Sequence, residues 1–156
     1  MPARPPIDID TLNRRGVGHL PGHMGLRFTE VTPEYLRAEF DVQPHHMAPN
    51  GYLHAASVIA LADTTAGYAC VTQLPAGAQG FTTLELKCNF LGTALEGTVC
   101  CEARPVHLGR NSQVWDVTVH AKGQTRTMAL FRCTQMILWP KAPPAPAADA
   151  ADPAAA

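Results

Sequence analysis

Alternating apolar and polar residues mark strands in two separate blocks of the chain. From Leu36 to Val42 every second residue is apolar, which is the period of a strand with one buried face. A similar alternation begins just before it, at Leu26 and Phe28. After a long interruption, β-rich segments separated by short glycine-containing turns occupy residues 83–90, 98–107, 114–121 and 127–138. The pattern predicts two strands, a different element, and then four more strands.

The interruption predicts one long helix. From His54 to about Leu74 nearly every side chain is small or apolar, and Pro75 ends the segment. It is long enough to span a bilayer, but Asp63 near its centre and several Ser, Thr and Gln residues would be penalised by lipid. A helix that is apolar all round must be enclosed, and here only the sheet can enclose it. We therefore predict an α+β hotdog fold at residues 23–141, a curved antiparallel β-sheet wrapped around one long central helix.

The two ends of the chain differ in composition from the middle. Residues 1–22 predict an N-terminal arm with a short helix over 9–15, for which Asp8 or Asp10 is the cap. Residues 142–156 contain Ala, Pro and Asp but no large apolar side chain, so we expect a disordered tail. The length of 156 residues then leaves room for a single domain between the two ends.

Composition and charge exclude several classes of protein. Hydrophobic residues make up 46% of the chain and charged residues 16%, which excludes a wholly disordered chain. The formal net charge of −1 argues against binding nucleic acid through a broad basic face. The five cysteines are odd in number and form no Cys-x-x-Cys pair, and no apolar run of the signal-peptide kind follows Met1. We therefore expect reduced, mostly buried thiols in a cytoplasmic protein, with no nucleic-acid or membrane partner.

Asp63 is the residue of the helix that most needs an explanation. An unpaired carboxylate on a buried helix costs on the order of several kcal/mol unless it is paired, hydrogen-bonded or protonated. It can hydrogen-bond to Thr64, Thr65 or a nearby backbone group, or its part of the helix can face a subunit surface. Alternatively, the site keeps the carboxylate out of bulk water to raise its basicity, as catalytic acids and bases require. The sequence leaves these alternatives open.

His54 opens the same helix, after a turn built around Gly51. The start of a helix presents unpaired backbone N–H groups and the positive end of the helix dipole, which together bind an oxygen that carries negative charge. The small side chains of Ala55 and Ala56 leave that approach uncrowded. The His54 side chain is a candidate catalytic group, with an N-terminal cap or a solvent-facing side chain as alternatives. Only the backbone N–H after it is needed for this chemistry.

Residues 49–63, with the sequence PNGYLHAASVIALAD, resemble the motif of the PaaI-like and 4-hydroxybenzoyl-CoA thioesterases. That motif has a Gly, two residues and His-Gly-Gly, with an acid further along the central helix at the spacing that separates His54 from Asp63. Residues 80–86 resemble the third strand of that family, and residues 108–110 resemble one of its strand turns. The resemblance extends over residues 20–139 and implies a hotdog fold, hydrolysis of acyl-CoA, and assembly into homodimers or homotetramers.

The resemblance also implies roles for individual residues. Asp63 matches the general base or nucleophile, and Ala55, through its backbone N–H, matches the glycine that polarises the thioester carbonyl. The sequence departs from the family in two features: Ala55 and Ala56 replace its Gly-Gly, and Ala48 stands where it has a polar Asn or Gln. Asn50 is the only close substitute for that polar residue.

Substrate-binding residues are expected in the turn before the helix and in the two other matched segments. The anionic nucleotide end of coenzyme A needs local positive charge, and Arg110 combines a guanidinium with the N–H groups of a turn. Arg104 and Arg132 are weaker candidates, because strand alternation would also expose them. The predicted contacts are Gly51, Thr82, Thr83, Arg110, Asn111 and Ser112.

These residues predict hydrolysis of the thioester between coenzyme A and a small acyl group, aromatic groups included. In this hypothesis the helix N-terminus polarises the carbonyl, while Asp63 either deprotonates a water molecule or attacks the carbonyl carbon. Two other functions stay open on the same fold: a non-hydrolytic acyl-CoA sensor, and a hydratase or dehydratase that uses an Asp and a His on the acyl chain. The predicted hydrolysis needs no cofactor, since coenzyme A is part of the substrate.

The spacing of His54 and Asp63 predicts that two chains share each active site. Nine residues at 1.5 Å per residue place Asp63 about 13 Å along the helix axis from the first N–H groups. A base and an oxyanion donor must both come within about 3 Å of one reacting carbonyl, which a single straight helix cannot achieve. Two helices related by a two-fold axis can, so we expect a homodimer with shared active sites. The family resemblance implies that such dimers can assemble further into a dimer of dimers, and the sequence leaves dimer and tetramer open.

Other chemistries lack their motifs. No Gly-x-Ser-x-Gly occurs, so a serine-hydrolase elbow is absent from the sequence. His45 and His46 could join His54 and Asp63 around a metal ion, but neither His-Glu-x-x-His nor a Cys/His cluster is present, so no metal site is predicted. We expect His45 and His46 to lie in a solvated loop, with a loop that lines the acyl pocket as the alternative.

Overall fold

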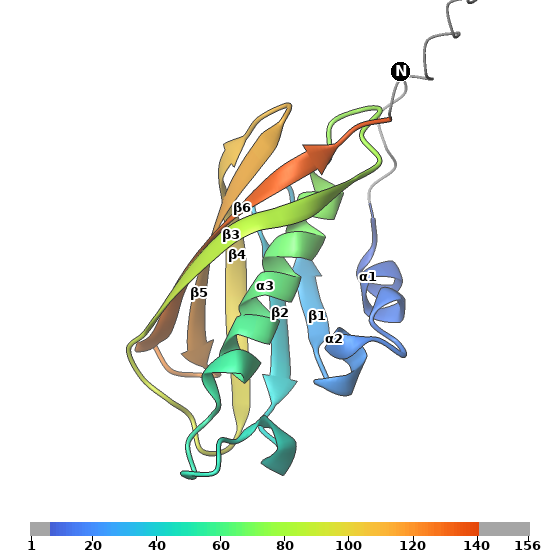
Figure 1. Cartoon of the computed structure of the whole chain (residues 1–156). Coiled ribbons are helices and arrows are strands. Elements are labelled where there is room, and N and C mark those ends of the chain that lie inside the picture. Colours follow the sequence, from blue (N-terminus) through green and yellow to red (C-terminus); the bar gives the residue numbers. More distant parts are fainter. Residues whose placement is uncertain (1–6, 141–156) are drawn as a thin grey trace, which may run out of the picture.

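The computed structural model describes residues 7–140, and its six strands form one antiparallel sheet in the order β1-β2-β4-β5-β6-β3 (Figure 1). The strands are β1 Arg27–Val31, β2 Leu36–Asp41, β3 Gly80–Phe90, β4 Thr98–Leu108, β5 Ser112–Ala121 and β6 Thr127–Leu138. Every strand predicted from the alternation is present. The expected tail over 142–156 and the first residues of the expected N-terminal arm lie outside the described residues.

One long helix, α3, spans Ala55–Thr72 and packs across one face of this sheet (Figure 1). Its sheet-facing side is a stripe of buried residues at helical spacing: Val58, Leu61, Ala62, Thr65, Ala66 and Ala69. The Cys101 thiol of β4 donates to Thr65 Oγ1 at 3.1 Å, which ties the helix to the sheet. By length and a mean hydropathy of 1.2 the helix would suit a membrane span, yet 50% of that segment is buried within this domain. The predicted hotdog architecture is confirmed.

The sheet covers only one side of α3, which corrects the expectation that it encloses the helix. A single twisted sheet wraps part of a helix circumference, and the opposite side stays uncovered in one chain. Ala55 and Ala56 are exposed, and Ile59 and Asp63 are half-buried. The helix therefore keeps an apolar, uncovered side that begins at its N-terminus and reaches Asp63.

The two edges of the sheet are treated differently. Helix α1, Ile9–Arg15, covers the β1 edge: Asn13 Oδ1 accepts from Phe28 N at 2.8 Å, and Asn13 Nδ2 donates to Phe28 O at 3.1 Å. The predicted bounds of this helix are confirmed, and its cap is Asp8, whose Oδ1 accepts from Thr11 N at 2.6 Å. The other edge is β3, which no element within residues 7–140 pairs on its outer side.

Two short helices, α2 over Leu20–His23 and η1 over Pro44–His46, were not predicted. Both carry a proline in the first turn and neither is long enough to show a hydrophobic period. The five cysteines are free thiols, three of them buried, as expected. Burial raises the pKa of Cys70, Cys101 and Cys133 to about 12, so these thiols are unreactive core residues.

Candidate active site

Asp63 lies midway along α3, on the flank of its buried stripe. Its Oδ1 atom is buried and has no hydrogen-bond partner, and no described residue forms an ion pair with the carboxylate. Thr65 does not supply the missing bond, since its hydroxyl donates to Leu61 O at 2.7 Å. Burial raises the pKa of the Asp63 carboxyl. Of the alternatives open in the sequence, the structure favours a carboxylate kept partly out of water without a local partner.

His54 is the N-cap of α3, and its ring is used for capping. His54 Nδ1 accepts from Ala56 N at 2.9 Å, and His54 O accepts from Ser57 N at 2.9 Å. Ala55 N–H, in contrast, makes no hydrogen bond with any residue of the described range. The first turn of α3 therefore presents one free N–H on an exposed surface at the positive end of the helix dipole. This is the donor that the sequence analysis assigned to Ala55.

The loop before α3 holds Asn50 and Gly51 beside the helix N-terminus and away from Asp63. Gly51 has φ +83°, in the left-handed region that glycine adopts freely, and it closes a turn onto Ala48 O at 2.9 Å. Asn50 Oδ1 accepts from Tyr52 N at 3.3 Å, so its side chain braces the same turn and remains exposed. Asn50 and Ala55 are thus placed together, at one end of the helix.

His46 departs from the expected solvated loop, because it is 1% exposed. Its carbonyl accepts from Ser57 Oγ at 2.8 Å and from His54 N at 3.0 Å, and its Nδ1 accepts from Gln43 N at 3.0 Å. Its ring lies against Phe40, with centroids 4.5 Å apart. His46 therefore anchors the start of α3. Sequence reasoning missed this because one histidine in a proline-containing loop carries no periodic signal, whereas neighbouring His45 is exposed as expected.

The buried His46 predicts a loss of stability in acid. Burial, with His45 and His23 nearby and the Met24 backbone opposing, lowers its pKa below the ordinary 6.5. As the pH falls below about 6.5 the unfolded chain takes up a proton that the folded chain excludes, so the free energy of unfolding decreases. One such group contributes at most about 1.4 kcal/mol per pH unit.

Urea unfolding between pH 7.5 and 5 measures this effect. In wild type, the free energy of unfolding should start to decrease as the pH falls below the ordinary histidine pKa. We expect the His46→Gln variant to lose this decrease, and the His45→Gln variant, at the exposed neighbouring ring, to keep it. Equal slopes in wild type and His46→Gln would assign the acid sensitivity to other groups.

Strand β3 separates the two predicted threonines. Thr83 pairs in register with buried Gln135 of β6 and so belongs to the sheet face that α3 covers, whereas Thr82 pairs with Met136 on the opposite face. A bulge between Thr83 and Glu85 interrupts the alternation. Of the two, only Thr83 shares a sheet face with the side chains that pack under Asp63.

The turn of Arg110, Asn111 and Ser112 lies near the C-terminal end of α3, since Gln113 Nε2 donates to Gln73 O at 2.9 Å. The Arg110 guanidinium stacks on the Trp139 ring, 4.4 Å from its centroid, and Trp139 Nε1 donates to Arg110 O at 3.2 Å. Within the part of the chain that is described, no acidic residue pairs with Arg110, whereas Arg104 and Arg132 pair with Glu102 and Asp116. Arg110 is therefore an oriented cation that remains available to an anion.

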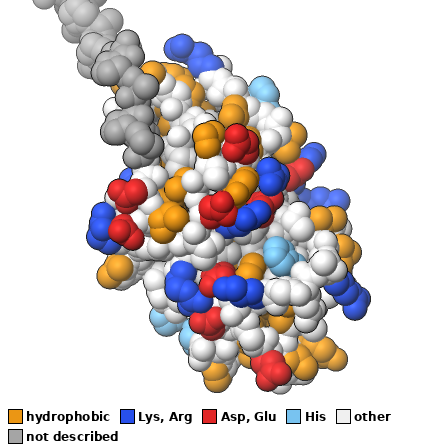
Figure 2. Space-filling view, turned by 180° about the vertical axis from the view of Figure 1, so that it is seen from behind, with side chains coloured by type: hydrophobic (Ala, Val, Ile, Leu, Met, Phe, Trp, Pro, Cys, Tyr) orange, Lys and Arg blue, Asp and Glu red, His pale blue; other side chains and the backbone are white. Residues whose placement is uncertain are grey.

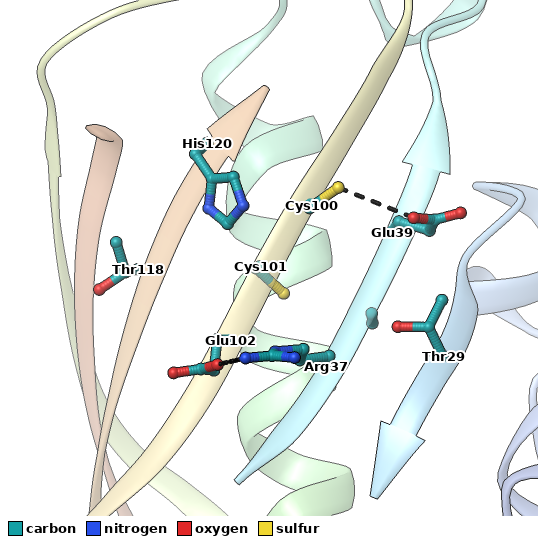
Figure 3. Close-up of a pocket in the computed structure, with 9 residues that line it drawn as sticks. Thr29, Arg37, Glu39, Cys100, Cys101, Glu102, Thr118 and His120 are labelled. Carbon is teal, nitrogen blue, oxygen red and sulfur yellow. Dashed lines mark hydrogen bonds and ion pairs between the residues drawn. The ribbon is translucent and has the colours of Figure 1, made fainter. Parts of the chain in front are cut away.

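The opposite face of the sheet carries a polar cavity that is unrelated to Asp63. Acidic and basic side chains interleave there, with apolar ones between them (Figure 2). The cavity has a volume of about 450 Å³, and Arg37, Glu39, Glu102 and His120 are among its lining residues (Figure 3). Its carboxylates are already paired, Glu39 with Lys122 and Glu102 with Arg37. Although burial works against it, Lys122 and Arg27 hold the pKa of Glu39 below its usual value. This cavity is a satisfied ion-pair network.

Two groups of the predicted residues thus lie at separate positions along the axis of α3. Ala55, His54, Asn50 and Gly51 gather at the N-terminus of α3, while Asp63 stands about 13 Å further along the same helix. Among residues 7–140, no three His, Cys, Asp or Glu side chains come close enough to hold a metal ion. The part of the chain that is described therefore offers one unbonded backbone N–H and one carboxylate without a partner, too far apart to act on the same atom.

Comparisons with known proteins identify the family of this chain. The sequence profile of the Thioesterase superfamily matches residues 50–128. The 1,4-dihydroxy-2-naphthoyl-CoA hydrolase of Escherichia coli K12 is 32% identical over 116 residues, which cover 72% of this chain and 82% of that protein. A proofreading thioesterase EntH of Cronobacter turicensis is 30% identical over 114 residues, covering 73% of this chain and 82% of that protein. A mutant form of thioesterase PA1618 from Pseudomonas aeruginosa superposes with a TM-score of 0.82 at 27% identity, covering 86% of this chain and 96% of that one.

Proposed function

Since the chain belongs to the thioesterase superfamily and is an acyl-CoA thioesterase, we propose that it cleaves small acyl-CoA thioesters, aromatic ones included, to the free acid and coenzyme A. The observation that carries this proposal is the Asp63 carboxylate, which is partly desolvated and unpaired on the uncovered flank of α3. A carboxylate in that state is a stronger base than one in water and is free to act.

The chemistry we propose uses two groups of the fold. Ala55 N–H donates to the thioester oxygen, where negative charge grows as the carbonyl carbon is attacked. Asp63 either takes a proton from the attacking water or forms the new C–O bond itself. In both routes the C–S bond breaks, and coenzyme A leaves as the thiolate and takes up a proton. In the general-base route water supplies the new oxygen of the acid. In the nucleophilic route Asp63 forms a mixed anhydride with the acyl group, and water then attacks the Asp63 carbon of that anhydride, so that the acid keeps an oxygen of Asp63 and Asp63 gains the oxygen of water. Single-turnover hydrolysis in ¹⁸O-labelled water separates the routes, because only a nucleophilic Asp63 acquires the label.

We also propose that the site forms between two copies of this chain. The support is the bare edge strand β3, which is exposed along most of its length and carries apolar side chains such as Leu84, 57% exposed, and Phe90, 45% exposed. Pairing this edge with a second copy would bring a partner helix to the uncovered side of α3, with its N-terminus level with Asp63. A dimer of dimers would further cover exposed apolar side chains on the other sheet face, among them Val106, Leu130 and Met136.

The cellular setting we propose is cytoplasmic, without a nucleic-acid partner, a membrane partner or a cofactor of its own. Five free thiols and a net charge of −1 support this setting.

Thiol release from a panel of acyl-CoAs tests the proposed function. We expect free thiol to appear with small acyl groups. Gain or loss of a double bond without thiol release would indicate a hydratase or dehydratase, and binding without turnover would indicate a sensor. Either outcome would overturn the proposal.

Arg110 is expected to hold the nucleotide phosphates of coenzyme A. Because a remote phosphate contact is made equally in the ground state and the transition state, Arg110→Ala should raise KM several-fold and change kcat little. The effect should shrink at high salt, since the side chain is exposed. Arg132→Ala, at an arginine already paired with Asp116, is the matched control and should leave KM unchanged. An unaltered KM in Arg110→Ala would place the phosphates elsewhere.

A further inference from the structure

Gly67 lies one helical turn after Asp63 on the same side of α3, and the ring of Phe81 occupies the space that a side chain there would take. A Cβ atom built on Gly67 would lie 2.9 Å from Phe81 Cζ, closer than such atoms approach in proteins. Glycine is unfavourable inside a helix relative to alanine, so its position in the middle of α3 makes room for this ring. Because a helical Cβ points toward the N-terminus, that space faces Asp63.

The same sheet face carries Phe81 and the residues beneath Asp63. Phe81 pairs in register with Ile137 of β6, and Leu86 pairs with Cys133; Ile137 and Cys133 are both buried under α3. Asp63 lies four residues before Gly67, whose Cα faces the Phe81 ring, so the carboxyl stands on the side of α3 that looks toward the β3–β6 ladder. Asp63 and the Phe81 ring therefore lie about one helical turn apart along the same side of α3, above the β3–β6 ladder.

The face of β3 that looks toward α3 is covered at the Phe81 end and exposed at the Phe90 end, and we call these the closed end and the open end. Phe81 is half-buried against Gly67, whereas Thr83, Leu86 and Phe90, further along the same face of β3, are exposed. The pantetheine arm of a thioester held at Asp63 must reach solvent, so it leaves through the open end. The Arg110 turn of the same chain lies at the closed end, since Asn111 O accepts from Ile137 N, so in the proposed two-fold dimer the phosphates would meet the Arg110 turn of the second copy. The acyl group is then directed to the closed end, where one helical turn, about 5.4 Å, separates Asp63 from Gly67.

We propose that Phe81 is the end wall of the acyl pocket and sets the largest acyl group that the enzyme accepts, with Gly67 providing the room for its ring. This inference rests on the proposed function. It assigns the substrate class as short-chain or single-ring acyl-CoAs, since an aromatic wall also offers edge-to-face contact to an aromatic acyl group.

The dependence of kcat/KM on acyl-chain length in Phe81 variants tests whether Phe81 forms the end of the acyl pocket. Thiol release gives kcat/KM for acetyl-, butyryl-, hexanoyl-, octanoyl- and benzoyl-CoA. A hydrophobic pocket discriminates one methylene by about tenfold or more, so Phe81→Ala should raise the octanoyl-to-butyryl ratio at least tenfold, and Phe81→Trp should lower it. Phe81→Leu provides the same test if the alanine variant does not fold. Leu130→Ala, on the far face of β6, is the control and should leave the ratio unchanged.

A smaller folded fraction lowers kcat/KM by the same factor for every substrate and leaves the ratio between two substrates unchanged. If Phe81 had a purely structural role, its variants would therefore lose kcat/KM for all acyl-CoAs in parallel. That parallel loss, or an unchanged ratio in the Phe81 variants, would overturn the wall while leaving the thioesterase activity in place. Absence of thiol release from every acyl-CoA with the wild-type protein would instead overturn the proposed function.

Discussion

Asp63→Asn is expected to lower kcat for acyl-CoA hydrolysis by at least about a hundredfold, which is the usual contribution of a positioned acid–base group. The amide keeps the size of the side chain but can neither take a proton from water nor attack a carbonyl carbon. The fold should persist, because within residues 7–140 the carboxylate makes no hydrogen bond that the substitution would break. Asp116→Asn, which alters an aspartate on the other sheet face, is the matched control and should keep its activity.

The same substitution should also increase stability at neutral pH. Burial raises the pKa of Asp63, so the folded chain holds its proton to a higher pH than the unfolded chain does. The free energy of unfolding therefore decreases as the pH rises from the ordinary aspartate value of 3.8 through the raised pKa, and stays lower above it. The amide of the variant has no such titration, and so its melting temperature should exceed that of wild type at pH 7 and match it in acid.

The activity of the wild-type protein should increase with rising pH over the range in which its stability decreases. In the proposed mechanism hydrolysis needs the ionised carboxylate, so kcat/KM should fall as the pH drops through the raised pKa of Asp63. If Asp63→Asn releases thiol within a few-fold of the wild-type rate, Asp63 has a structural role and the proposed mechanism is refuted.

The secondary structure was predictable because two periods dominate the chain. Residues 36–42 and 127–138 alternate with period two against a single core, and the apolar run after His54 is too long for a strand. Local capping was predictable for the same kind of reason, since Asp8 needs only its own first turn to act. The spacing of His54 and Asp63 was enough to place the two candidate groups at different levels of one helix.

Contacts between distant segments were not predictable from these patterns. The burial of His46 depends on Phe40 and on the start of α3, and the room for Phe81 depends on Gly67. The apolar positions of β3 also indicated a strand with a buried face, yet Leu86 and Phe90 are exposed in one chain. A hydrophobic period shows that a face is to be covered and carries no information about which molecule covers it.

Mixing two inactive variants is expected to restore about a quarter of the wild-type activity, because in the proposed dimer each site uses Ala55 of one chain and Asp63 of the other. Asp63→Ala removes the carboxylate, and Ala55→Pro removes the one free N–H of the helix start. Proline is tolerated at this first helical position, and His54 already has φ −66° and ψ 136°, the extended conformation that a following proline requires. Ala55→Gly, which keeps the N–H, is the control and should remain active.

The expected fraction follows from the geometry of a two-fold dimer. When the two variants are unfolded and refolded together in equal amounts, half of the dimers should be mixed by chance. Each mixed dimer contains one site with both groups intact and one site that lacks both. Half of the sites in half of the dimers are therefore complete, and each variant refolded alone should remain inactive.

The outcome decides between two arrangements of the same residues. If folded variants form mixed dimers and no activity returns, each chain carries its own complete site, and α3 would have to bring the Ala55 N–H and the Asp63 carboxylate to one carbonyl. The distance of about 13 Å along a straight helix argues against that arrangement, because Ala55–Thr72 is one continuous helix. Recovery to about a quarter would place the reacting carbonyl between the helix start of one chain and the carboxylate of its partner.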